Sequence, residues 1–274
     1  MKYSVLMSVY QKENPDYLKK AVESILNQTV KPDDFLIVWD GPLTLQLAEV
    51  LERFRAEHTE MIHFLKLERN VGLGEALRQG VEACRNSLIA RMDSDDISVP
   101  ERMEWQLEAF QRIPSLALCG GQIEEFQVIP EEIQSIRMVP ISHDEIVSCA
   151  RKRNPMNHMT VMFRKEYVLS AGNYQPMAYM EDYYLWVRML MKGAIAVNLP
   201  QILVKARVGN GMLARRGGFQ YAVSIKNVML AFYKIGFISR YECISNIVIR
   251  GLVSLMPSRI RQMIYHKALR QRRG

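Results

Sequence analysis

The sequence of 274 residues is 49% hydrophobic and 24% charged, which is ordinary for a soluble globular protein of one large domain or one domain with an appendage. Its four cysteines, Cys84, Cys119, Cys149 and Cys243, are widely spaced without a CxxC pair, which argues against a zinc site or a disulfide framework. The formal net charge is +7, and the seven basic residues after Glu242, with no acidic residue among them, account for all of it.

We expect no targeting or membrane-spanning segment. The first nine residues are too short and too alternating for a signal peptide. No apolar run reaches the roughly 18 to 20 residues that a spanning helix needs. Together with free cysteines, which fit a reducing compartment, this predicts a cytoplasmic protein.

Strands and helices alternate over the first hundred or so residues. Apolar, β-branched runs predict strands at 3–9, 35–39, 61–67 and 88–92, and helical spacing predicts helices from Asn14-Pro15, at 43–56 and at 75–85. This rhythm predicts a parallel sheet with helices on both faces. Ligands of such sheets bind beyond the carboxyl ends of the strands, where Asp40 and Asp93 lie.

The rhythm changes in the second part of the chain. We expect helices at 100–112, from the capping box that begins at Ser142, at 165–171 and at 183–192, and strands at 116–125, 159–163, 195–197 and 202–206. From about Phe219 the chain should be helical, with a helix at 244–255 and a basic helix after Pro257.

The most informative segment is Asp93-Ser94-Asp95-Asp96, which follows a buried strand. Three carboxylates in four residues repel one another unless a positive group joins them. Mg²⁺ or Mn²⁺ prefers oxygen ligands and keeps substrate phosphates in its shell, so a metal–diphosphate site is one interpretation. The other is a solvated acidic turn that caps the next helix, since Ser98 and Pro100 also resemble a helix start.

These motifs together resemble the inverting glycosyltransferases of family 2, closest to bacterial exopolysaccharide or amylovoran-type sugar transferases. The resemblance rests on SVLMSVY at 4–10, VESILNQT at 22–29, VWDG at 38–41, NVGLG at 70–74, DSDD at 93–96 and MED at 180–182. It covers most of the chain, to about Gly218. It implies a GT-A fold, in which a Rossmann-like nucleotide half joins an acceptor half, a nucleotide-sugar donor and a divalent metal, Mn²⁺ or Mg²⁺.

The resemblance also implies roles for individual residues. Asp93 and Asp95 become the ribose and metal carboxylates, with Asp95 the direct metal ligand, and Asp96 a helix cap or a residue behind the ligands. Asp40 is assigned to the nucleoside, although Asp-Gly-Pro is also a common turn. Trp39 stands where the family usually has a further Asp. The predicted nucleotide-binding residues are Ser8, Tyr10, Asp40, Asn70, Gly72, Arg78, Asp93 and Ser94.

Asp182 is the candidate general base, with Glu181 beside it. Inverting sugar transfer needs a carboxylate to remove the proton of the acceptor hydroxyl during attack on the anomeric carbon. The alternative is that carboxylates at a helix start only stabilise the helix.

Four further residues are candidates for contact with the diphosphate or the acceptor, and Arg78 is a separate candidate for contact with the nucleotide. Arg207, Arg215 and Arg216 lie on a Gly-rich segment and could clamp a diphosphate, or form an exposed basic loop. His158 could contact phosphate or acceptor, or be an ordinary structural histidine. Arg78 could approach the nucleotide, or lie on a solvated helix face.

The basic C-terminal segment predicts a membrane contact. After Pro257, apolar residues at helical spacing alternate with basic ones, which suits an interfacial helix on anionic lipid. Nucleic acid is the alternative partner, but stacking aromatic residues are sparse there. We therefore expect a peripheral protein on the inner face of the bacterial cytoplasmic membrane and no nucleic-acid partner.

We predict a GT-A domain at 1–218, with a nucleotide-binding half at 1–100 and an acceptor half at 101–218, and a membrane-associating helical region at 219–274. The expected activity is transfer of a sugar with inversion, from a nucleotide donor such as a UDP-sugar to a saccharide acceptor, plausibly polyprenyl-diphosphate-linked, in surface polysaccharide assembly. Two alternatives are a sugar nucleotidyltransferase, which would favour a glycine after the first strand, and a non-catalytic nucleotide-sugar-binding partner.

Overall fold

The parallel part of the sheet is built from the first four strands. The computed structural model describes residues 1–209 and 217–257. In it β1 (Tyr3–Val9), β2 (Asp34–Trp39), β3 (Ile62–Lys66) and β4 (Leu88–Met92) pair in parallel in the order β3-β2-β1-β4. The helices α1 (Pro15–Leu26), α2 (Leu45–Glu57) and α3 (Leu73–Ala83) connect them. The predicted alternation of strand and helix is confirmed.

The second half extends the same sheet with mixed directions. Beyond β4 the order continues β8-β6-β9-β5, with β7 on the side of β6; β6 and β9 are parallel, and the other pairs here are antiparallel. The strands are β5 (Ile97–Ser98), β6 (Leu116–Phe126), β7 (Ile133–Arg137), β8 (Met162–Arg164) and β9 (Ile195–Arg207). The helices are α4 (Arg102–Arg112), α5 (His143–Ala150), η1 (His158–Thr160), α6 (Lys165–Ser170) and α7 (Glu181–Met191).

Several elements differ from the sequence-based expectation. The two short strands expected near residues 195 and 206 are one strand, β9, which follows β6 through register shifts around Gly121 and Gln122. The expected strand at 159–163 begins later, because the η1 turn comes first. β5 and β7 were not predicted, since two residues or a polar pentapeptide carry little periodicity.

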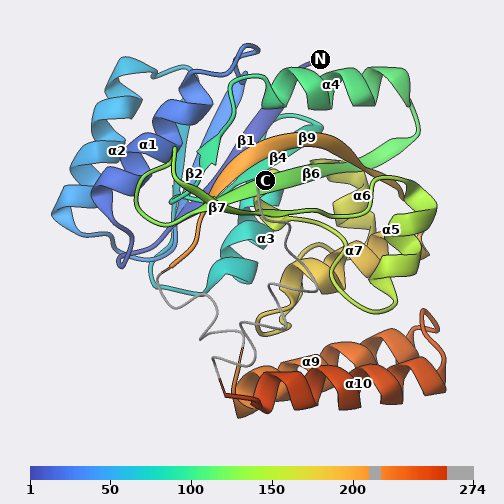
Figure 1. Cartoon of the computed structure of the whole chain (residues 1–274). Helices are drawn as coiled ribbons and strands as arrows, with labels where there is room; N and C mark the ends of the chain where they lie inside the picture. The colour runs from blue at the N-terminus through green and yellow to red at the C-terminus, as the bar shows by residue number, and fades with distance from the viewer. Residues whose placement is uncertain (210–216, 258–274) are drawn as a thin grey trace.

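The sheet separates two apolar cores. In β1, Tyr3, Val5, Met7 and Val9 face the core shared with α1, α2 and α4, whereas Leu6 faces the core shared with α3, α5, α6 and α7. Successive strand residues point to opposite faces, so a strand covered on both sides is apolar throughout. Figure 1 shows the sheet with α1, α2 and α4 on one side and α3 and α7 on the other.

The helices α9 (Phe219–Lys234) and α10 (Arg240–Leu255) form a hairpin that packs on α7 (Figure 1). Tyr183 of α7 meets Phe232 of α9 with ring centroids 4.8 Å apart. Arg151, after α5, binds both carboxylate oxygens of Glu242 at 2.7 and 2.6 Å. These two helical segments were expected; the basic helix predicted after Pro257 lies outside the described residues. No helix within 1–209 and 217–257 is long and apolar enough to cross a membrane.

Two glycines in helices provide a paired test of this packing. A Cβ at Gly80 of α3 would collide with Leu6 Cδ1 and lie 3.0 Å from Val38 Cγ2, whereas a Cβ at Gly251 of α10 would meet nothing within 4 Å. Overpacking costs about 1–3 kcal/mol and alanine gains up to about 1 kcal/mol over glycine in a helix. We therefore expect Gly80→Ala to lower the free energy of unfolding in urea and Gly251→Ala to raise it slightly. Equal stability of the two variants would contradict the close approach of α3 to the sheet.

Candidate active site

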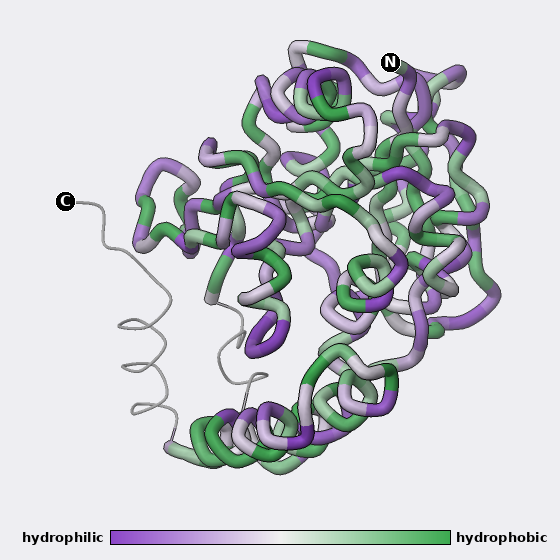
Figure 2. The backbone as a smooth tube through the Cα atoms, turned by 90° about the vertical axis from the view of Figure 1, so that its right-hand side faces the viewer, coloured by the Kyte–Doolittle hydropathy of each residue, from purple (hydrophilic) through white to green (hydrophobic). Residues whose placement is uncertain are grey.

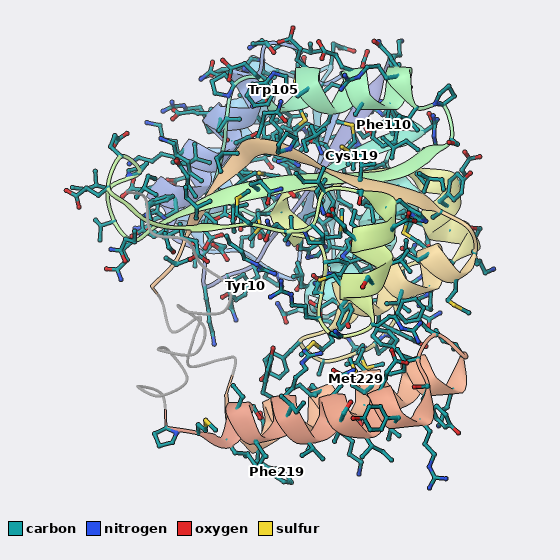
Figure 3. All side chains as sticks on the ribbon, turned by 45° about the vertical axis from the view of Figure 1, so that its right-hand side comes forward. Tyr10, Trp105, Phe110, Cys119, Phe219 and Met229 are labelled. Carbon is teal, nitrogen blue, oxygen red and sulfur yellow. The ribbon has the colours of Figure 1, made fainter. Side chains whose placement is uncertain are left out.

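The carboxyl ends of β1, β2 and β4 bring the predicted residues to one edge of the sheet. Met7 pairs with Met92, so Ser8 lies level with Asp93. The amide of Asp40 donates to the carbonyl of Val9 at 2.8 Å, immediately before Tyr10. Figure 3 shows Tyr10 on the side of the sheet that faces the α9–α10 hairpin. The predicted crevice edge is therefore formed by neighbouring strands.

Asp40 is buried and fixes the loop before α3. Its carboxylate accepts hydrogen bonds from the amides of Val71 at 2.6 Å and Gly72 at 3.1 Å, and from the Asn70 side chain at 3.0 Å. Gly41, with φ of +84°, passes so close that a Cβ would lie 2.5 Å from the Asn70 nitrogen. Both carboxylate oxygens thus already have partners in the loop, and the nucleoside role of Asp40 stays a prediction.

Arg91, which sequence reasoning missed, is the central cation of this edge. It lies in β4, is 2% exposed, and forms an ion pair with Asp93. Its Nε and Nη1 have no hydrogen-bond partner among the described residues. The signal was present in the sequence, because an arginine inside a strand that is otherwise apolar on both faces needs a buried partner.

The acidic turn after β4 is anchored to β9. Asp96 is buried and accepts a hydrogen bond from the Arg207 amide at 2.7 Å. Burial, then the neighbouring carboxylates, raise the pKa of Asp96 well above its ordinary value. Burial, then Asp93, raise the pKa of Asp95 to about 6. No carboxylate of the turn caps α4, whose N-cap is Glu101 without a side-chain bond, so the capping interpretation is wrong.

The second pair of acids begins α7. Asp182 accepts hydrogen bonds from the Asn154 side chain at 2.6 Å and from the Tyr183 amide at 2.7 Å. Burial raises the pKa of Asp182, and burial, then Asp182, raise the pKa of Glu181 to about 7. A Cβ added to Gly74 would lie 3.4 Å from Glu181 Cβ, so the starts of α3 and α7 adjoin.

The two acid groups form one electrostatic cluster around Arg91. Its positive charge lowers the pKa values of Asp95, Asp96, Glu181 and Asp182 against the larger effect of burial. The charge of Arg91 thus acts on acids from two segments that are distant in the sequence. Asn154, which holds Asp182, is a further contributor that no local motif indicated.

His158 lies beside this cluster in an aromatic contact. Its Nε2 is 2.8 Å from the Tyr174 hydroxyl, and its ring centroid is 5.9 Å from that of Trp186. Burial of the ring, then Arg91, hold the pKa of His158 well below its ordinary value, so the imidazole is neutral. The contacts with Tyr174 and Trp186 give His158 a structural role that needs no ligand. A contact of His158 with phosphate or acceptor stays a prediction.

The arginine candidates differ in their surroundings. Arg207, at the end of β9, donates to the Asp95 carbonyl at 3.2 Å and stacks on Tyr17 at 3.6 Å, while its Nη2 is buried without a hydrogen-bond partner among the described residues. Arg78 pairs with Glu75 at 2.6 Å and Glu82 at 3.0 Å along α3, as a solvated helix face would. Arg215 and Arg216 lie outside the described residues.

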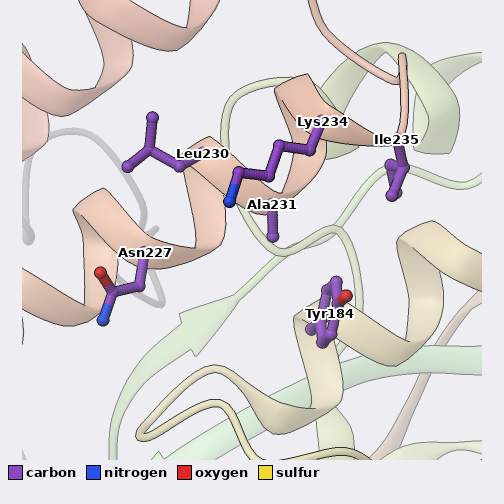
Figure 4. Close-up of a pocket in the computed structure, with 6 residues that line it drawn as sticks. All are labelled: Tyr184, Asn227, Leu230, Ala231, Lys234 and Ile235. Carbon is purple, nitrogen blue, oxygen red and sulfur yellow. The ribbon is translucent and has the colours of Figure 1, made fainter.

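The described residues contain no group of three His, Cys, Asp or Glu side chains that could hold a metal unaided. Two carboxylates at one turn are enough when a diphosphate supplies further oxygens. A separate groove of about 460 Å³ lies between α7 and α9 (Figure 4), lined by Tyr184, Asn227, Leu230, Ala231, Lys234 and Ile235. None of the predicted site residues lines it.

The chain is similar to known glycosyltransferases over nearly its whole length. The chain is 39% identical to the amylovoran biosynthesis glycosyltransferase AmsE of Erwinia amylovora, over 97% of this chain and 98% of that one. It is 36% identical to an Escherichia coli UDP-Gal:alpha-D-GlcNAc-diphosphoundecaprenol beta-1,3-galactosyltransferase, over 98% and 97%.

Solved structures share the fold. S. aureus TarS 1–349 in complex with UDP-GlcNAc superposes with a TM-score of 0.69 at 14% identity, over 98% of this chain and 76% of that one. The mannosyltransferase PcManGT from Pyrobaculum calidifontis, in complex with GDP-Man and Mn²⁺, superposes with a TM-score of 0.66 at 12% identity, over 97% and 75%. The expected GT-A fold is confirmed. The family model named Glycosyl transferase family 2 matches residues 4–186, and the chain belongs to that family of glycosyltransferases.

Proposed function

We propose that this glycosyltransferase moves one sugar, with inversion, from a UDP-sugar to a lipid-linked saccharide in surface polysaccharide assembly. The observation that carries the proposal is the convergence of the acids after β4 and at the start of α7 around Arg91. The names of the Erwinia and Escherichia relatives support a polysaccharide product, a UDP-sugar donor and a diphosphoundecaprenol acceptor. Residues 1–218 would form the catalytic unit and 219–274 the membrane-associating region.

The donor half of the site follows from the turn after β4. Asp93 and Asp95 would hold a divalent cation, Mn²⁺ or Mg²⁺, because carboxylate oxygens suit a hard ion. Burial, then Asp93, raise the pKa of Asp95, and a bound cation would favour its ionised form. The bound ion would supply neutralisation of the leaving diphosphate. Ser8, Tyr10, Asn70, Gly72 and Ser94 would contact the nucleotide, with Asp40 holding the loop in place. Arg207, His158 and the segment with Arg215 and Arg216 would adjoin the diphosphate.

The acceptor half follows from the start of α7. The Asp182 carboxylate would take the proton of the acceptor hydroxyl while that oxygen attacks the anomeric carbon and the bond to the diphosphate oxygen breaks. Asn154 fixes one oxygen of Asp182 and the Tyr183 amide the other, so the carboxylate is oriented before substrate binds. Glu181 would share the proton, since the neighbouring Asp182 raises the pKa of Glu181.

The basic residues after Glu242 support peripheral attachment to the inner face of the cytoplasmic membrane. Anionic headgroups attract such a segment by about 1 kcal/mol per basic residue close to the surface. A lipid-linked acceptor would then be presented at the same surface. This attachment would be electrostatic, and raised salt would weaken it.

The base assignment predicts a paired result. Asp182→Asn should lower kcat by about 10²- to 10⁴-fold, while Glu181→Gln should cost less and Glu166→Gln, at the exposed start of α6, nothing. Because the pKa of Glu181 is raised to about 7 and that of Asp182 is also raised, kcat/KM should fall as the pH drops through about 7. Initial rates of UDP release between pH 5.5 and 8.5 measure both the effect of each substitution on kcat and the pH dependence of kcat/KM. Full activity of the Asp182 and Glu181 variants would remove the assignment.

The raised pKa of Asp95 predicts that a substitution in the candidate metal site should make the metal-free protein more stable. A carboxyl whose pKa is higher in the folded state than in the unfolded state destabilises the fold as the pH rises above the unfolded value near 4. For Asp95 that penalty is complete above about 6. Asp95→Asn should therefore be more stable than wild type at pH 7.5 without metal, by on the order of 1 to 2 kcal/mol, with little difference at pH 4.

Thermal unfolding with added Mn²⁺ completes that test. In the presence of UDP, whose diphosphate supplies the further oxygen ligands, wild type should gain stability from Mn²⁺ by mass action and Asp95→Asn should gain much less. Asp144→Asn, an exposed carboxyl on α5, is the control and should respond as wild type does. Equal stabilisation of all three proteins by Mn²⁺ would exclude Asp95 as a ligand.

The basic tail predicts salt-sensitive binding to anionic vesicles. Replacing Arg259, Arg261, Lys267 and Arg270 with Gln should weaken sedimentation with phosphatidylglycerol vesicles by about tenfold or more at low salt. The matched control replaces Lys19, Lys20, Arg53 and Arg55 on α1 and α2, which removes the same charge elsewhere. If both variants bind alike, only overall charge matters and the tail has no special role.

A further inference from the structure

The helix α10 has its apolar side turned outward. Tyr241, Ile244, Val248, Ile249, Leu252 and Leu255 are between 51% and 81% exposed and recur at helical spacing, and we name this set the α10 outer face. The side turned toward the protein includes the buried polar residues Asn246 and Ser254. A helix on the surface of a soluble protein normally turns its apolar side toward the core and its polar side toward solvent. The α10 outer face therefore indicates an interaction site.

Polar contacts fix this orientation of α10. Asn246 donates to the Arg151 carbonyl at 2.9 Å, and Arg250 donates to the Lys152 carbonyl at 3.1 Å. Glu242, in the first turn, binds the Arg151 guanidinium. Rotation of the helix to bury its apolar side would break all of these bonds and leave polar groups in the interface. The outward apolar face is therefore a specified feature of the fold.

The same surface continues onto the start of α9. The Gly218 amide donates to the Ser254 carbonyl at 2.9 Å, which places Phe219, 76% exposed, beside the end of α10. In Figure 3 Phe219 points away from the body of the protein, whereas Met229 points toward it. Figure 2 shows long hydrophobic stretches along this hairpin. Aromatic residues thus stand near both ends of the apolar stripe, as at a membrane interface.

Charge favours a lipid surface over other occupants. Arg240 begins α10 in an exposed position, and the sequence after Glu242 contains seven basic residues and no acidic one. An apolar face that is followed in the sequence by concentrated positive charge suits acyl chains and anionic headgroups. A second copy docked on this face would bring two such basic segments together, and like charges oppose that association.

We propose that the α10 outer face, together with Phe219, inserts into the interfacial layer of an anionic membrane. This rests on the proposed membrane attachment and names the element that penetrates the surface, in addition to the electrostatic tail. The hairpin lies on the side of the sheet where Tyr10 follows β1 (Figure 3), so the bilayer would lie on the side of the site edge. A diphosphate-linked acceptor anchored in that bilayer would approach the acids from the hairpin side.

Vesicle binding by the full-length protein tests the proposal. Ile244→Ser/Leu252→Ser removes the middle of the stripe, and Leu45→Ser/Val128→Ser changes two residues that are 82% and 71% exposed on the body. Flotation with phosphatidylglycerol vesicles at low salt and at 0.5 M NaCl separates apolar insertion from electrostatic attraction. We expect the first variant to bind at least about tenfold more weakly at both salt concentrations and the second to bind as wild type does.

The outcomes distinguish a failure of membrane insertion from a failure of the proposed transferase activity. Transfer to a water-soluble acceptor should be unchanged in the Ile244/Leu252 variant, and unaltered vesicle binding by that variant would overturn the proposal. So would light scattering that shows wild type as a dimer and the variant as a monomer, because a second copy would then cover the face. If the wild-type protein transferred sugar to no acceptor, that result would contradict the proposed function, and the vesicle-binding result would be unaffected.

Discussion

Burial of like charges around one arginine is the constraint on which the site depends. Asp93, Asp95, Glu181 and Asp182 come from a turn and a helix start nearly ninety residues apart, and Arg91 supplies the positive charge between them. Arg207 also acts on Asp95 and Arg137 on Asp182, but burial outweighs these arginines and raises the pKa values of both acids. The folded protein thus lacks positive charge around these carboxylates, and a cation bound together with a diphosphate would supply it.

The architecture explains how this deficit is tolerated. The buried Arg102 of α4 donates to the Arg91 carbonyl at 2.8 Å and supports β4 from the opposite face, and Asp96 ties the acidic turn to β9. Asp40 holds the loop that starts α3, and α3 meets α7 at Gly74. The acids therefore lie on a rigid frame, which is the arrangement that electrostatic catalysis requires. The hairpin α9–α10 packs on α7.

Local sequence predicted much of this and missed what depends on tertiary contact. Apolar periodicity located β1 to β4 and most helices, because buried strands and amphipathic helices are encoded residue by residue. β5 and β7 were missed because pairing with β9 and β6 defines them. Motif order pointed to Asp93, Asp95 and Asp182. Arg91 was overlooked although its place in an apolar strand indicated a buried partner, whereas Asn154 had no local signal, because its partner Asp182 is far away in the sequence. The outward orientation of the apolar side of α10 was also not predicted, because helical spacing shows that one side is apolar but not whether that side faces the core or the solvent.

Nucleotide binding with and without metal tests the central claim most directly. Isothermal titration of UDP into the wild-type protein should give an affinity in Mn²⁺ at least about tenfold tighter than in EDTA, because in the proposed site a cation would join the acids after β4 to the diphosphate. The gain should disappear in Asp95→Asn. Equal UDP affinity in Mn²⁺ and in EDTA would contradict the account, since the acid cluster would then have no part in holding the donor.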